Sequence, residues 1–263
     1  MTHYFDRLAE RTRETGSYLC VGLDPQPERH APEELPGFLI PIVEATAPYA
    51  ACFKPNLAFF EAHGIPGLLA LERVLAAVPS GIPVIGDMKR GDIGSTSRAY
   101  ARAAFEVWGF DAVTANPYLG FEGIEPFLEY ADRGVYVLCR TSAAGAADLQ
   151  SERLASGLRV FEHVARLVGS RPERLGLVVG ATARSEEVAA VRRLAPGASF
   201  LVPGVGAQGG DIEAVVAAAG VTPGSIVFNA SRSILYPDGQ PASPDRAAEA
   251  ARRLRDRIAA AVR

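Results

Sequence analysis

The chain has 263 residues, of which 48% are hydrophobic and 22% are charged, as in an ordinary soluble globular protein with a full core. The formal net charge of −3 speaks against a general affinity for nucleic acid or anionic membranes. No apolar run approaches the roughly 20 residues of a membrane span, and the first residues lack the features of a signal peptide. We therefore expect a cytoplasmic protein with neither nucleic-acid nor membrane partners.

Eight short apolar runs predict strands that are covered on both faces. In chain order they are 18–23, 50–53, 82–85, 111–115, 135–139, 175–179, 199–202 and 225–228. Helical patterns lie before, between and after them, at 8–15, 38–46, 57–78 with a break at 64–67, 95–108, 121–130, 151–168, 185–194, 211–219 and 244–262. This alternation predicts a single (β/α)8 TIM barrel of the α/β class over residues 1–263. A doubly wound open sheet is the alternative, because alternation alone does not establish closure.

The three cysteines are predicted to be reduced core residues. Cys20, Cys52 and Cys139 all lie inside apolar runs that are expected to be strands. Their spacing is not that of metal ligands. No metal site is predicted from them.

Polar side chains gather where the predicted strands end, and in a barrel this edge carries the active site. Asp87 and Lys89 share a face of an extended segment, because alternate side chains of a strand point the same way. Asp92 follows Gly91, which leaves the chain direction open, so Asp92 meets either this cluster or that of a neighbouring subunit. Taken singly, most residues of the set are compatible with ordinary loop capping. The set is Asp24, Lys54, Asn56, Asp87, Lys89, Asn116, Ser142, Gln208 and Arg232.

Lysine is scarce in this chain, since Lys54 and Lys89 are the only lysines among 27 basic residues. Both follow apolar runs that are expected to be strands. A preference for arginine in coding explains the scarcity, and a simple salt bridge is the alternative role for either lysine. Lysine differs from arginine in being a compact ammonium that gives up a proton readily. We therefore interpret both lysines as part of a catalytic cluster.

The loops after the seventh and eighth predicted strands suit an anion. Gly204 begins a glycine-rich run that ends at Gly210, and such a run lets backbone N–H groups approach a ligand closely. Ser231 and Arg232 add a hydroxyl and a permanently charged guanidinium. Each loop alone is compatible with a tight turn or a solvated charge. Two such loops on adjacent strands predict a phosphomonoester ligand.

Together these motifs resemble the orotidine 5′-phosphate decarboxylase family. The run Asp87-x-Lys89-x-x-Asp92-Ile93-x-x-Thr96 is similar to the bacterial branch in which the catalytic run reads D-x-K-R-G-D-I. The segments 54–56, 203–210 and 229–232 fit the same family, so the likeness extends from Asp24 to Arg232. The resemblance implies decarboxylation of orotidine 5′-phosphate to uridine 5′-phosphate and CO2 in pyrimidine biosynthesis, without a metal or an organic cofactor.

The resemblance also implies roles for individual residues. Lys89 is the acid that protonates C6, Asp87 lies beside the leaving carboxylate, and Lys54 completes the charge network. Asp92 and Thr96 enter the site of the partner subunit in a homodimer. Asp24 contacts the ribose, Ser142 the pyrimidine, and Gln208 with Arg232 the phosphate. The expected substrate-binding residues are Asp24, Asn56, Thr96, Ser142, Gly204, Gln208, Ser231 and Arg232.

Two other functions are open at this point. Related barrels such as 3-keto-L-gulonate-6-phosphate decarboxylase are similar at D-x-K-x-x-D, and such an enzyme is expected to use a divalent metal. A catalytically idle barrel that binds a nucleotide is the alternative from a different class. The intact set of Asp87, Lys89 and Asp92 favours an enzyme.

Overall fold

A computed structural model describes residues 2–206 and 210–263 and contains all eight expected strands in one parallel sheet. The sheet order is β2-β1-β8-β7-β6-β5-β4-β3. Parallel bridges from Phe53 to Val84 and from Asn56 to Asp87 join β2 to β3 and close the sheet. The (β/α)8 barrel is therefore confirmed, and the open-sheet alternative is wrong. The strands are β1 (Leu19–Leu23), β2 (Cys52–Pro55), β3 (Ile85–Arg90), β4 (Ala112–Ala115), β5 (Gly134–Arg140), β6 (Leu175–Val179), β7 (Phe200–Pro203) and β8 (Ile226–Ala230).

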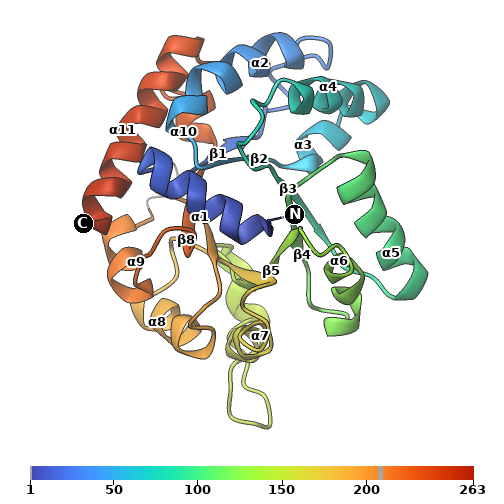
Figure 1. The fold of residues 1–263 in the computed structure, drawn as a ribbon, viewed down its shortest axis with the longest axis vertical. Coiled ribbons are helices and arrows are strands. Elements are labelled where there is room, and N and C mark those ends of the chain that lie inside the picture. The colour runs from blue at the N-terminus through green and yellow to red at the C-terminus, as the bar shows by residue number, and fades with distance from the viewer. Residues whose placement is uncertain (1, 207–209) are drawn as a thin grey trace.

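Apart from α1, the helices form a ring around the strands (Figure 1). The α-helices are α1 (Tyr4–Thr15), α2 (Leu35–Thr46), α3 (Leu57–Glu61), α4 (Gly64–Ala76), α5 (Gly94–Arg102), α6 (Glu125–Leu128), α7 (Val160–Val168), α8 (Ser185–Leu194), α9 (Ile212–Ala219), α10 (Arg232–Leu235) and α11 (Pro244–Val262). Shorter turns are the 3₁₀ segments η1 (Ala47–Tyr49), η3 (Phe121–Gly123) and η4 (Ala144–Asp148) and the π segment η2 (Ala103–Val107). Within the described ranges, no helix is both long and apolar enough to cross a membrane.

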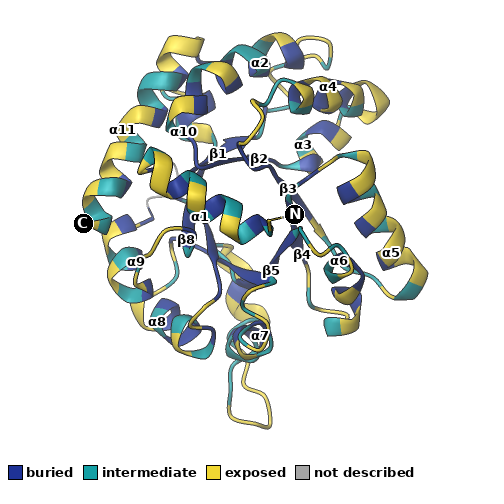
Figure 2. Cartoon of the chain, viewed as in Figure 1, coloured by how far each residue is buried: buried dark blue, intermediate teal, exposed yellow. Residues whose placement is uncertain are grey.

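The strands are buried over most of their length (Figure 2), and side chains fill the barrel interior. One residue from each strand joins a buried cluster with Tyr4 and Leu8 of α1. The hydroxyl groups of Tyr4 and Tyr136 lie 3.3 Å apart, so α1 covers the end of the barrel where the strands begin (Figure 1). The opposite end is left for the functional site. The strand residues of this cluster are Cys20, Cys52, Ile85, Ala112, Tyr136, Val178, Leu201 and Val227.

The prediction for the cysteines is confirmed. Cys20 and Cys52 lie in this interior cluster, and they are partners in the register of β1 and β2. Cys139 lies between β5 and α7, where its Sγ donates to the carbonyl oxygen of Phe161 at 3.2 Å. All three are buried and free of disulfides.

The third strand lies further along the chain than the predicted segment 82–85. Pro83 has no N–H to donate, and the N–H of Val84 donates to the side chain of Asp111 at 2.9 Å instead of to a strand. The ladder begins at Ile85 and runs through Arg90, so the strand contains Asp87 and Lys89 rather than ending before them.

The helix predicted at 151–168 begins only at Val160. The preceding residues form a protruding turn below α7 in Figure 1, held by the N–H of Leu154 donating to the carbonyl of Leu158 at 2.9 Å. Gly157 supplies the positive φ that this turn needs. The helix then begins where the Glu162 carboxylate accepts the N–H of Arg159 at 2.7 Å.

Three other helical segments are divided differently from the prediction. The break in 57–78 falls at residues 62 and 63, and α4 begins at Gly64 with Pro66 in its first turn, where a missing N–H is tolerated. The segment 95–108 changes from α to π winding after Arg102, and 121–130 is split into η3 and α6. The short helix α10, which follows β8, was not predicted.

Candidate active site

A cavity of about 660 Å³ opens at the carboxyl ends of the strands, on the side of the barrel opposite α1. Its walls come from the ends of β1, β2, β3, β7 and β8 and the loops that follow them. Several expected site residues meet there although they are far apart in the sequence. Those that line the cavity are Asp24, Lys54, Asn56, Asp87, Gly204, Ser231 and Arg232.

A chain of alternating charges crosses the floor of this cavity. The Nζ of Lys54 lies 2.8 Å from Oδ2 of Asp87, and the Nζ of Lys89 lies 2.6 Å from Oδ1 of the same carboxylate. Lys54 also lies 3.9 Å from Oδ1 of Asp24, which accepts the backbone N–H of Asn56 at 3.2 Å. Both oxygens of Asp87 are thus held by cations, one on each side.

Burial and charge act in opposite directions on these groups. Burial lowers the pKa of Lys54, but the carboxylates of Asp24 and Asp87 outweigh burial and raise this pKa above its ordinary value. Burial likewise raises the pKa of Asp87, but Lys54 and Lys89 hold it well below its usual range. For Asp24 burial prevails over the attraction of Lys54, so its pKa is raised. Lys54 and Asp87 are therefore both charged near neutral pH.

The two lysines differ in their surroundings. The side chain of Lys54 is 3% exposed, whereas that of Lys89 is 47% exposed. Lys89 lines a smaller adjoining cavity of about 160 Å³, which shares Asn56 and Asp87 with the larger cavity. Its backbone φ is +47°, a left-handed value that no other non-glycine residue adopts in ranges 2–206 and 210–263. Lys89 therefore reaches the site through Asp87 and not by lining the main cavity.

Unpartnered hydroxyls lie near the ends of β7 and β8: Ser231 lines the cavity, and Ser233 lines an adjoining cavity of about 400 Å³ that shares Arg232 with it. The Oγ atoms of Ser231 and Ser233 are buried, and neither has a hydrogen-bond partner among the described residues. Gly206, at φ +83°, approaches Ser233 so closely that an added Cβ would lie 2.8 Å from its Oγ. Hydroxyls facing bare backbone in this way suit an anionic group. The expected phosphate contact Gln208 lies outside the described residues.

Asp92, Thr96 and Ser142 do not line the cavity. The Asp92 carboxylate accepts the N–H of its neighbour Ile93 at 2.8 Å, and Thr96 is exposed in the first turn of α5. Ser142 follows β5 and lies against Gly180, where an added Cβ would lie 2.5 Å from the Ser142 nitrogen. Within one chain, these three residues are thus separate from the charge chain.

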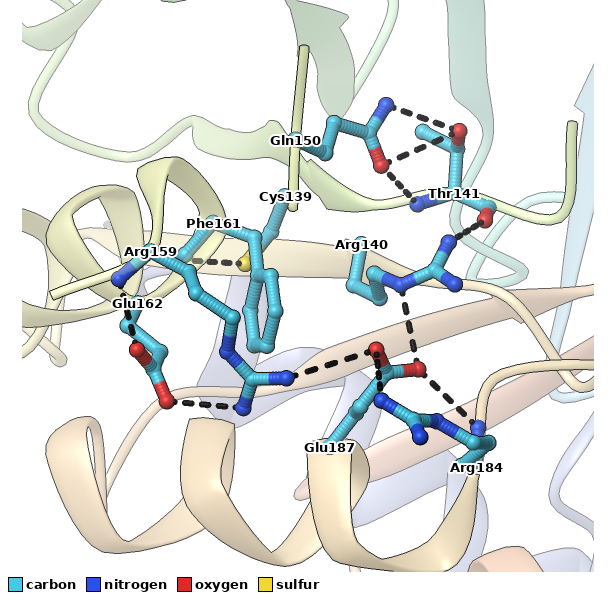
Figure 3. A network of polar contacts seen from close by, with 9 residues as sticks. All are labelled: Cys139, Arg140, Thr141, Gln150, Arg159, Phe161, Glu162, Arg184 and Glu187. Atoms are coloured by element: carbon cyan, nitrogen blue, oxygen red, sulfur yellow. Dashed lines mark hydrogen bonds and ion pairs between the residues drawn. The ribbon is translucent and has the colours of Figure 1, made fainter. Parts of the chain in front are cut away.

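The loop that carries Ser142 is fixed by a polar network, which Figure 3 shows. The amide of Gln150 bonds Thr141 twice, accepting its N–H at 2.9 Å and donating to its Oγ1 at 2.9 Å. The buried carboxylate of Glu187, on α8, accepts from Arg140 at 3.1 Å and Arg184 at 3.2 Å. Arg159 lies 3.6 Å from the same carboxylate. This network holds both ends of the segment 141–159 against α8.

Several residues at the site were not selected from the sequence, among them Asn229 and Thr114. Asn229 lines the cavity and donates through Nδ2 to the carbonyl of Cys20 at 3.2 Å, which ties β8 to β1. In the sequence, Asn229 lies in the segment 229–232, close to Ser231 and Arg232, which were expected to contact an anion. Thr114 is buried in β4 and contacts Asp87. Thr114 is the only threonine in the eight predicted strands, but no sequence pattern links it to the charged residues of the third strand.

The fold and the site together define a (β/α)8-barrel enzyme whose mouth combines a lysine–aspartate–lysine chain with a place for an anion. Residues 17–251 match the family model "Orotidine 5′-phosphate decarboxylase / HUMPS family". The chain therefore belongs to the orotidine 5′-phosphate decarboxylase / HUMPS family.

Individual relatives agree with this assignment. The chain is 48% identical over 272 residues to the orotidine 5′-phosphate decarboxylase of Roseiflexus castenholzii, and the match covers 99% of each chain. Among solved structures it is similar to Leishmania donovani OMP decarboxylase, with 39% identity, a TM-score of 0.87 and 99% of each chain covered. It is also similar to Leishmania donovani UMP synthase, with 40% identity and a TM-score of 0.89. That match covers all of this chain and 57% of the longer one.

Proposed function

We propose that this chain decarboxylates orotidine 5′-phosphate to uridine 5′-phosphate and CO2 in pyrimidine biosynthesis. The observation that carries the proposal is that the Lys54–Asp87 ion pair and the anion-suited Gly204, Ser231 and Arg232 open into one cavity. One ligand can therefore contact a charged catalytic cluster at one end and bind through its phosphate at the other. Family membership supports the same reaction.

The orientation of the substrate follows from the charges of the cavity. We assign the phosphate to the end with Gly204, Ser231 and Arg232, because this end offers hydroxyls, bare backbone and a guanidinium. Asp24 follows β1, the neighbour of β8 in the sheet, and is assigned to a ribose hydroxyl next to the phosphate. The base then extends toward Asp87 and Lys89, with its carboxylate near the charge chain.

The chemistry requires a proton donor at C6. When the bond between C6 and the carboxylate breaks, its electron pair stays on C6 and CO2 leaves. The resulting carbanion lies in the ring plane and takes a proton from the Nζ of Lys89, which regains one from water. The same ammonium stabilises the carbanion before the transfer, in a site that is already organised for it.

Repulsion by Asp87 contributes less than this stabilisation. A substrate carboxylate about 4 Å from Asp87 is repelled by about 4 kcal/mol at an effective dielectric constant of about 20. Enzymes commonly lower barriers by about 8–23 kcal/mol. Most of the lowering of the barrier is therefore assigned to the charge of Lys89 and to the binding energy of the phosphate, which stabilises the transition state.

Replacement of Lys89 tests the assignment. An assay that follows the loss of orotidine 5′-phosphate absorbance should find that Lys89→Ala lowers kcat by about 10⁴-fold or more, because it removes the general acid. The circular dichroism spectrum should not change. Arg253→Ala, at an exposed position of α11, serves as the control and should keep full activity. An inactive unmodified protein, or an active Lys89→Ala variant, would contradict the proposed function.

We also infer a homodimer in which each subunit completes the active site of the other. The family resemblance assigns Asp92 and Thr96 to a partner's site, and their position outside the cavity of their own chain supports this assignment. The surface around them exposes Ile93 and, on the adjacent loop after β4, Tyr118 and Leu119. Exposed apolar residues grouped in this way are typical of protein interfaces.

Hybrid dimers test this arrangement. After co-expression of Lys89→Ala and Asp92→Ala chains, a hybrid has one site with both defects and one site with neither. Half of randomly paired dimers are hybrids, so a symmetric dimer should regain about a quarter of wild-type activity. Activity no higher than that of the two parent variants would argue against shared sites.

The domain organisation and the cellular location of the protein can each be tested. We propose that residues 1–263 act as one barrel domain, which a single unfolding transition in calorimetry would support. The cytoplasmic location is tested by fractionation of cells that produce the protein.

A further inference from the structure

We propose that Thr114 is a positioning residue for this reaction: its hydroxyl fixes both the Asp87 carboxylate and the backbone that carries Lys89. The inference rests on the proposed function, since it assigns Thr114 to the same charge chain. Thr114 is 1% exposed and does not line the cavity, so it acts through its neighbours and not on the substrate.

The Thr114 hydroxyl joins three groups of β3. It donates to Oδ1 of Asp87 at 2.9 Å. It accepts the backbone N–H of Met88 at 3.1 Å and that of Lys89 at 2.9 Å. Oδ1 is also the oxygen that holds the Lys89 ammonium, at 2.6 Å. A single buried hydroxyl therefore fixes the carboxylate and the main chain that leads into the proposed acid.

The register of the two strands explains why a side chain is needed at this point. Gly86 pairs with Val113 and Arg90 pairs with Ala115, so four steps along β3 face two steps along β4. The extra residues bulge away from the ladder, and their N–H groups find no regular strand partner. Thr114 lies in the middle of the two-step stretch, opposite the bulge, and its hydroxyl takes the place of the missing backbone acceptors.

The bulge also accounts for the conformation of Lys89. A φ of +47° is unfavourable for a side chain with a Cβ, and the surrounding structure must hold it in place. The N–H of Lys89 is held by Thr114, and the Lys89 ammonium is held by the carboxylate to which Thr114 donates. Without the Thr114 hydroxyl, the contact to the Lys89 N–H is lost and the Asp87 carboxylate is less firmly placed. The Lys89 ammonium then no longer has a single fixed position.

Thr114→Val tests the inference, because valine keeps the shape and removes only the hydroxyl. We expect kcat to fall by about 100-fold, as a displacement of about 1 Å in a catalytic group can produce. The Kd for uridine 5′-phosphate should stay within about threefold, because phosphate binding is separate from the bulge. Thr114→Ser keeps the hydroxyl and should restore most of kcat. Thr46→Val, a buried threonine at the end of α2, is the matched control and should retain kcat.

A measurement on the unmodified protein covers the case in which Thr114→Val fails to fold. The amide hydrogens of Met88 and Lys89 should exchange slowly, and Thr114→Ser should keep this protection together with kcat. Fast exchange of either amide would overturn the inference, as would full kcat in Thr114→Val or an equal loss in Thr114→Ser. An unmodified protein that does not decarboxylate orotidine 5′-phosphate would instead contradict the proposed function itself.

Discussion

Lys54→Met should destabilise the protein strongly, because it leaves two carboxylates without their shared buried cation. At an effective dielectric constant of about 20, an ammonium 2.8 Å from Asp87 and 3.9 Å from Asp24 gains gross attractions of about 6 and about 4 kcal/mol. Desolvation of the three groups offsets much of this attraction. Removal of one partner from a buried ion pair lowers the free energy of unfolding by about 3–5 kcal/mol, which is the loss that we expect here. Methionine keeps the length of the side chain, so the loss reports charge rather than volume.

Urea unfolding near neutral pH, at fixed protein concentration, measures this loss. Arg257→Met breaks an exposed ion pair with Glu213 and should change the free energy of unfolding by about 1 kcal/mol at most. The difference in the free energy of unfolding between Lys54→Met and wild type should narrow below about pH 4. The pKa of Asp87 is lowered in the folded protein, so its charge stabilises the fold fully above the pKa of the unfolded chain. This stabilisation is lost as Asp87 becomes protonated at lower pH. A loss under 1 kcal/mol, or a difference unchanged by acid, would refute the reasoning.

Two more substitutions probe the phosphate end and the loop of Ser142. Arg232→Ala should weaken uridine 5′-phosphate binding by about 10- to 100-fold in calorimetry, as the loss of a charged hydrogen bond does. Unchanged affinity would remove Arg232 from the phosphate site. Glu187→Gln should lower the free energy of unfolding by about 3 kcal/mol at neutral pH. Burial raises the pKa of Glu187, but hydrogen bonds from Arg184 and Arg140 outweigh burial and lower this pKa. The loss in the free energy of unfolding should therefore shrink as the pH falls below about 4 and Glu187 becomes protonated in the wild type. A loss of equal size at all pH values would contradict the role of its charge.

The elements that were predicted correctly carry their signals locally. The strand Leu175–Val179 and the helices Ser185–Leu194 and Pro244–Val262 have the predicted bounds. The last helix is capped by Ser243, whose side chain accepts the N–H of Arg246, and has Pro244 in its first turn. Such caps involve residues within one turn of one another, so the sequence pattern alone is enough to find them.

Two elements that were predicted wrongly begin where backbone partners allow, one through a distant contact and one through a local turn. The start of β3 is set by Asp111, 27 positions away from the Val84 N–H that it accepts. The start of α7 is set by the turn around Gly157, which no helical periodicity reveals. Both segments contain apolar runs of the right kind, but the ladder or helix begins only where the backbone partners allow it.

In the active site, too, some features followed from local sequence patterns and others depend on the pairing of two strands. The rule that polar residues follow barrel strands brought Asp24, Lys54, Asn56 and Asp87 to one cavity. The left-handed backbone of Lys89 and its support by Thr114 follow from the register between β3 and β4. Register is a pairwise property of two strands, so a pattern within either strand does not contain it.

The unequal exposure of the two lysines supports their different assignments. Lys54 is almost fully buried between two carboxylates, so it has no ready exchange of protons with water and serves as a fixed charge. Lys89 shares Asp87 with it but is 47% exposed. An acid that gives up a proton in each turnover must recover one from solvent, and of the two lysines only Lys89 meets that requirement. Because Lys54 already compensates Asp87, Lys89 can turn from this carboxylate toward the substrate carbon without leaving a buried charge unpaired.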